Sequence, residues 1–99
     1  MKLPILVDTA EIALFCRKHH IVKFAFFGSV ITERFTEDSD VDVLVEFDPE
    51  HVPGMIRLCG MERELSELLG RKADMRTQGD LSRYFRDEVV KLAVVQYAA

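Results

Sequence analysis

The segment from Asp40 to Phe47 constrains the fold more than any other part of this chain, because its side chains alternate with a period of two. One set of alternating positions is Val41, Val43, Val45 and Phe47, and the other is Asp40, Asp42, Leu44 and Glu46. Successive side chains of a strand point to opposite faces, so the segment is predicted to be a strand. Asp48-Pro49-Glu50 ends it, since proline cannot donate to a ladder.

A helix and a second strand are predicted before residue 40, with the helix first in the chain. Asp8 followed by Glu11 predicts a helix start, and the basic run at residues 17–20 suits a helix C-terminus. The aromatic-rich stretch at residues 23–27 predicts a strand that stops at Gly28, with one short helix after it.

Three elements are expected after the strand. A helix follows Pro53-Gly54 and ends at Gly70, and a short strand spans residues 72–76 with Asp74 facing away from its neighbours. A last helix starts near Asp80 or Ser82. Its predicted apolar side contains Tyr84, Phe85, Val89, Leu92 and Ala93. The prediction is an α/β (α+β) chain with a small, mixed three-stranded sheet packed with helices, in a single domain over residues 1–99.

Composition excludes several classes of protein. Hydrophobic residues make up 48% and charged residues 30%, as in ordinary globular domains, and no apolar run approaches the roughly 20 residues of a membrane span. A net charge of −4 argues against stable nucleic-acid binding through phosphates. Cys16 and Cys59 have no metal-ligand spacing, and Asp8 interrupts the apolar N-terminus before it reaches signal-peptide length. We therefore expect a cytoplasmic protein with free thiols.

The pair Gly28-Ser29 at the end of the first strand is suited to a phosphate. Glycine lets the backbone approach a ligand closely, and serine adds a hydroxyl and an N–H donor. Taken alone, the pair is more typical of a strand-ending turn.

Asp40 and Asp42 lie two positions apart and therefore on one face of the next strand. Two adjacent like charges are costly unless a divalent cation lies between them, and Mg²⁺ prefers carboxylate and phosphate oxygens. To meet Gly28-Ser29 at one phosphate, the two strands must run antiparallel. Asp74 is then the expected third carboxylate. Taken alone, Asp40 and Asp42 fit a solvated strand face equally well.

The pattern Gly28-Ser29-x10-Asp40-x-Asp42, with a strand on either side of it, resembles the minimal nucleotidyltransferase family of the DNA polymerase beta-like superfamily. The resemblance extends to residues 72–77 and 81–85, and covers the chain from about Val22 to the end. It implies the polymerase beta-like fold. It also implies that Gly28 and Ser29 hold a nucleoside triphosphate, and that Asp40, Asp42 and Asp74 bind Mg²⁺ and are catalytic.

The resemblance further implies an activity and a partner. Family members transfer a nucleoside monophosphate, usually AMP from ATP, to a hydroxyl, and small members are commonly antitoxins that modify a tyrosine of a HEPN-domain ribonuclease toxin. Many members carry an arginine where this chain has Val30, and Arg34 is the nearest basic residue in the loop. The alternative is a catalytically weak or inactive module that neutralises its partner by binding alone. The preferred nucleotide, the acceptor and the homo- or hetero-oligomeric state stay open.

Overall fold

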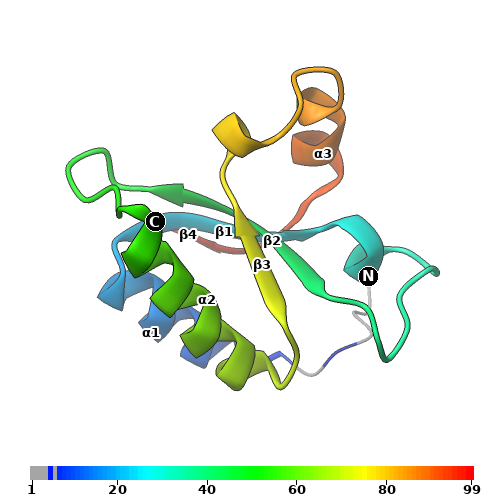
Figure 1. Cartoon of the computed structure of the whole chain (residues 1–99), viewed down its shortest axis with the longest axis horizontal. Coiled ribbons are helices and arrows are strands. Elements are labelled where there is room, and N and C mark those ends of the chain that lie inside the picture. The colour runs from blue at the N-terminus through cyan, green and yellow to red at the C-terminus, as the bar shows by residue number, and fades with distance from the viewer. Residues whose placement is uncertain (1–4, 6) are drawn as a thin grey trace.

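The computed structural model describes residue 5 and residues 7–99, and arranges them as a sheet with helices on both of its faces (Figure 1). The apolar N-terminal stretch at residues 1–7 therefore lies largely outside the described residues. In chain order the elements are α1 (Thr9–Lys18), β1 (Ile21–Phe27), the 3₁₀ helix η1 (Gly28–Ile31), β2 (Val41–Phe47), α2 (Met55–Leu69), β3 (Ala73–Arg76), the 3₁₀ helix η2 (Gln78–Asp80), α3 (Arg86–Leu92) and β4 (Val94–Ala98).

The sheet has four strands in the order β3-β2-β1-β4. β1 pairs antiparallel with both β2 and β4, and β2 pairs parallel with β3. The predicted mixed α/β class is confirmed, and so is the antiparallel pairing of the two strands that flank Gly28-Ser29. Within the described residues, no helix is both long and apolar enough to cross a membrane.

The two long helices begin and end where the sequence predicts. The Asp8 carboxylate caps α1 by accepting hydrogen bonds from the backbone N–H groups of Ala10 (2.9 Å) and Glu11 (3.3 Å). α2 ends at Gly70, which adopts a left-handed conformation with φ of +70°. Both helices pack on the same face of the sheet, where they bury its main hydrophobic core (Figure 1).

Side chains of α2 also satisfy the free edge of β3. The Ala73 N–H donates to Ser66 Oγ at 2.9 Å, and the Met75 N–H donates to Glu62 Oε2 at 2.7 Å. An uncovered edge strand is a template for pairing with other chains. These two bonds close that edge, and they fix β3, which carries Asp74, against α2.

The C-terminal part of the sequence prediction is wrong. The chain forms a short α3 instead of one long helix, and the expected three-stranded sheet gains β4, whose Val94 and Tyr97 lie opposite Phe26 and Phe24 of β1. The physical reason is the outer edge of β1, whose hydrogen-bonding groups need a partner, together with the strand propensity of valine and tyrosine. Tyr84 and Phe85, predicted to pack, precede α3 and are mostly exposed.

Candidate active site

Two of the predicted carboxylates, Asp42 and Asp74, lie on the face of the sheet opposite α1 and α2. Asp42 of β2 is opposite Phe27 in the β1–β2 pair and beside Asp74 in the parallel β2–β3 pair. Their strand neighbours Val41, Val43, Ala73 and Met75 all point into the helix-covered core. The alternation seen in the sequence therefore separates the carboxylates from the core and brings two of them together on adjacent strands.

Gly28 lies directly against the Asp42 carboxylate. Its φ is +73°, a left-handed conformation that favours glycine, and a Cβ atom built there would collide with the Asp42 side chain. The close approach expected at this glycine is thus made to one of the predicted metal ligands. Gly28 permits the turn after β1 and the carboxylate of β2 to share one small space.

The turn after Gly28 is a single turn of 3₁₀ helix. The Ser29 carbonyl accepts hydrogen bonds from Thr32 N and Thr32 Oγ1, both at 2.9 Å, and the Arg34 N–H donates to Thr32 Oγ1 at 3.2 Å. No hydrogen bond within the described residues engages the Ser29 hydroxyl. Val30 is fully buried in the core. A side chain at this position therefore points away from the ligand side of the turn in this chain.

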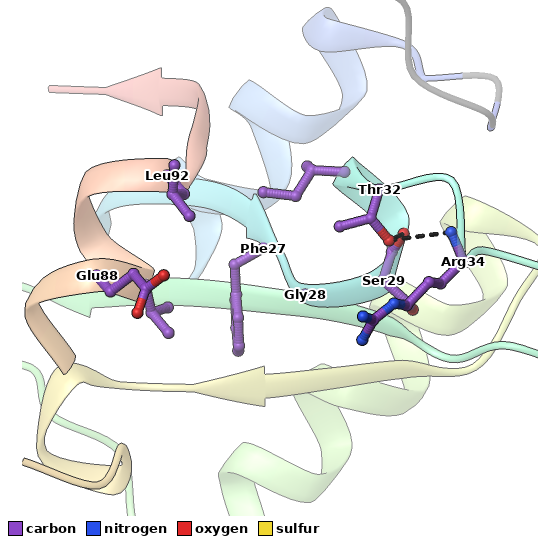
Figure 2. A pocket seen from close by; sticks show the side chains of 9 residues that line it. Phe27, Gly28, Ser29, Thr32, Arg34, Glu88 and Leu92 are labelled. Atoms are coloured by element: carbon purple, nitrogen blue, oxygen red, sulfur yellow. Dashed lines mark hydrogen bonds between the residues drawn. The ribbon is translucent and has the colours of Figure 1, made fainter. Parts of the chain in front are cut away.

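A cavity of about 410 Å³ opens beside this turn. Figure 2 shows Glu88 and Leu92 of α3 on one side, Phe27 in the middle, and Ser29, Thr32 and Arg34 on the other. Ile31 and Val89 complete the lining, so the walls are largely apolar, with one basic and one acidic side chain. This composition suits a ligand that has a flat apolar part and a charged part.

The electrostatics of the carboxylates favour a cation. Burial, and then the nearby negative charges of Asp74 and Asp40, raise the pKa of Asp42 above its ordinary value, while Arg76 acts in the opposite direction. Arg76 Nη2 and Nε donate to one oxygen of Asp74, at 3.1 and 3.3 Å. Among the described residues, the Asp40 carboxylate has one charged partner, Lys72, at a long 3.9 Å.

The structure brings the five predicted residues near one another without gathering them at one point. Gly28 and Ser29 line the first cavity, whereas Asp40 and Asp74 line a second hollow of about 410 Å³ at the edge of β3 beside α2. Asp42 links the two groups through its contacts with Gly28 and its pairing with Asp74. In the described part of the chain, no three His, Cys, Asp or Glu side chains are arranged to hold a metal ion.

The donor set nevertheless fits a hard divalent cation, because it consists of carboxylate oxygens whose mutual repulsion already perturbs Asp42.

The walls that α3 contributes to the first cavity were missed by the sequence prediction. The sequence predicts Leu92 on the apolar side of a longer helix, but 58% of it is exposed. Nothing in the sequence indicates that Glu88 lines a cavity, because this depends on where α3 lies over the sheet. The sequence identifies Arg34 only as the nearest basic residue in the loop.

Comparisons with known proteins agree with this geometry. A family model described as a nucleotidyltransferase domain matches residues 10–95. A Methanocaldococcus jannaschii protein, provisionally named a protein adenylyltransferase, is 31% identical over 77 residues, which are 78% of this chain and 81% of that protein. Protein adenylyltransferase MntA of Thermococcus cleftensis is 34% identical over 68 residues, covering 69% of this chain and 67% of the relative.

A solved structure shares the fold. It is titled as a toxin–antitoxin with AMP-PNP, and one of its chains superposes with a TM-score of 0.75 at 17% sequence identity. The match covers 94% of this chain and 75% of the other. The four-stranded mixed sheet with its helices is therefore the fold of that chain as well.

Proposed function

This chain belongs to the nucleotidyltransferase domain family and is a nucleotidyltransferase, and we propose that it transfers AMP from ATP to a hydroxyl of a partner protein. The observation that carries the proposal is the contact of Gly28 with Asp42, beside Asp74 and at the rim of a cavity. Two relatives that are named protein adenylyltransferases support AMP as the transferred group and a protein as the acceptor.

In this proposal the turn after β1 holds the triphosphate. The Ser29 hydroxyl, which makes no hydrogen bond within the described residues, is a donor for phosphate oxygens. Gly28 has no side chain, so phosphate oxygens can approach its backbone closely. Arg34 adds a positive charge on the same side of the cavity. Phe27 and Leu92 offer apolar surface to the nucleoside.

Asp40, Asp42 and Asp74 are the proposed ligands of Mg²⁺. When bound, the ion would neutralise charge on the triphosphate and on the leaving pyrophosphate. The acceptor hydroxyl attacks the α-phosphorus, the bond from that phosphorus to the pyrophosphate oxygen breaks, and pyrophosphate leaves. Asp74 takes the proton of the hydroxyl, since Arg76 bonds to only one of its two oxygens.

We further propose that the acceptor is a tyrosine of a HEPN-type ribonuclease toxin, which makes this chain its antitoxin. The shared fold with a chain of a toxin–antitoxin complex supports this role. The geometry also favours a large acceptor, because the site lies on the sheet face that α1 and α2 leave open. The free Cys16 and Cys59 and the need for ATP favour the cytoplasm as the compartment.

The test combines the purified chain, its candidate toxin, Mg²⁺ and labelled ATP. We expect label and the mass of AMP on the toxin, and loss of both with an Asp40→Asn/Asp42→Asn double variant. Glu46→Gln is the matched control, because Glu46 lies on the same face of β2 but is bonded to Gln78. Transfer retained by the double variant would refute the carboxylate assignment.

One observation favours the second candidate, a module that neutralises its toxin by binding alone. Within the described residues, Asp40, Asp42 and Asp74 do not converge on one point where a metal ion could be held. The same experiment separates the two functions. Inhibition of the toxin that persists without ATP, and in the double variant, would select the binding module.

A further inference from the structure

The loop of residues 32–40 connects the turn that carries Ser29 to the strand that begins just after Asp40. Most of its residues are exposed, so packing alone does not hold it. We propose that Arg71 is a positioning residue that fixes this loop and thereby Asp40. The proposal rests on the proposed function, since Asp40 matters to transfer only if it is part of the site.

Arg71 contacts the loop in three ways. Its Nη1 donates to the carbonyl oxygens of Thr36 and Glu37, at 3.1 and 3.0 Å. Its guanidinium also lies over the Phe35 ring, 4.7 Å from the centroid. A planar guanidinium can stack on an aromatic ring and donate to two carbonyls at once.

The contacts fall on the turn that leads directly to Asp40. The Thr36 carbonyl also accepts a hydrogen bond from Ser39 N–H at 3.1 Å, and the Thr36 N–H donates to Ser39 Oγ at 3.0 Å. Arg71 therefore stabilises a closed turn over residues 36–39, whose last residue precedes Asp40.

A second anchor lies immediately after Asp40. The Val41 N–H donates to the Lys72 carbonyl at 2.8 Å. Asp40 is thus flanked by two attachments, one to Arg71 and one to Lys72, and both come from the connection between α2 and β3. Because its side chain makes no ion pair or hydrogen bond with the described residues beyond the long Lys72 contact, its position depends on these backbone anchors.

Loss of the Arg71 contacts should loosen the loop without unfolding the domain, since the bonds lie at the surface. Small displacements of a catalytic group are costly, and we expect Arg71→Ala to lower kcat/KM for AMP transfer by about tenfold to a hundredfold. The Arg71 side chain lines neither cavity, so the loss should fall mainly on kcat rather than on KM for ATP.

The experiment compares Arg71→Ala, Arg71→Lys and Arg57→Ala in the full chain with its toxin. Arg57 is an exposed α2 arginine with no hydrogen bond or ion pair in the described residues, so it controls for loss of charge. The measurements are kcat and KM for ATP, the melting temperature, and hydrogen exchange of the Ser39 amide without ligands. We expect slower transfer and faster Ser39 exchange in Arg71→Ala, partial recovery with lysine, and no change in Arg57→Ala.

Two results would overturn the proposal. One is wild-type kcat and wild-type Ser39 exchange in Arg71→Ala. The other is equal loss in the lysine and alanine variants that follows a fall in melting temperature, which would assign Arg71 a merely structural role. If the unaltered chain transfers no AMP, the proposed function itself fails and Arg71 loses its role in it, whereas Ser39 exchange still reports whether the loop contact exists.

Discussion

The two faces of the sheet are made by alternate residues of the same strands, yet one is closed under α1 and α2, whereas the other, which also buries Ala25 and Leu44, is open around its carboxylates. Phe26 of β1 and Val43 of β2 lie under α1 and α2 and are fully buried. On the opposite face, Asp42 and Asp74 remain partly accessible, and the α3 helix that lies over this side buries none of its own residues.

Because of this difference, residues that stabilise the fold alternate along the strands with residues that are proposed to act in the reaction. Burial of large apolar side chains on the closed face supplies most of the driving force for folding. The open face tolerates neighbouring carboxylates because water and Arg76 reduce their repulsion. Substitutions one position apart should therefore fail in different ways.

The largest expected effect is on the closed face. Phe26→Ala should lower the free energy of unfolding by about 3–5 kcal/mol, because it leaves a cavity in the core. Phe85→Ala is the matched control, since Phe85 is 60% exposed and its loss should change stability by at most about 0.5 kcal/mol. Chemical denaturation of both variants measures the difference. Equal losses would contradict the assignment of the two faces.

Gly28→Ala should affect both stability and AMP transfer, because Gly28 lies against the Asp42 carboxylate. A left-handed alanine costs of order 1–3 kcal/mol, and the collision with Asp42 adds to that cost and displaces the carboxylate. Gly70→Ala provides the comparison, because Gly70 has a similar φ of +70° but open space around it. We expect both variants to lose stability, Gly28→Ala more so, and only Gly28→Ala to lose AMP transfer. Normal transfer by Gly28→Ala would refute the role of this contact.

The smallest expected effect is the pH dependence of stability at Asp42. Its folded-state pKa is raised above the ordinary value of 3.8, so its stabilising contribution is complete below that value and is lost as the pH rises through the folded pKa. Asp42→Asn should therefore become more stable relative to the wild type as the pH rises from acid to neutral. Denaturation at several pH values checks this, and parallel curves would show that Asp42 is not perturbed.

Much of the site could be predicted from sequence because it depends on local rules. Alternation in β2 places Asp42 opposite to Val43, and Gly28 ends β1 where the two strands must run antiparallel to share a ligand. Asp74 follows from the same alternation in β3. These features require only the period of a strand and the conformational freedom of glycine.

The remaining features depend on contacts between distant segments. The apolar run of Leu92, Ala93, Val94 and Val95 fits a helix or a strand, and the free edge of β1 decides between them. The cavity wall from α3 and the Arg71 bonds to Thr36 and Glu37 likewise arise only after the chain has folded. The transfer of AMP to a hydroxyl of a partner protein is proposed from the relatives and from this geometry.

The most direct test of the separation between the two faces uses the neighbours Asp42 and Val43. Unfolding free energy and AMP transfer to the toxin would be measured for Asp42→Asn and Val43→Ala, with transfer assayed well below the melting temperature. We expect Val43→Ala to lose about 2 kcal/mol of stability and keep its transfer activity. Asp42→Asn should lose transfer with no loss of stability. Transfer by Asp42→Asn at the wild-type rate would contradict the account.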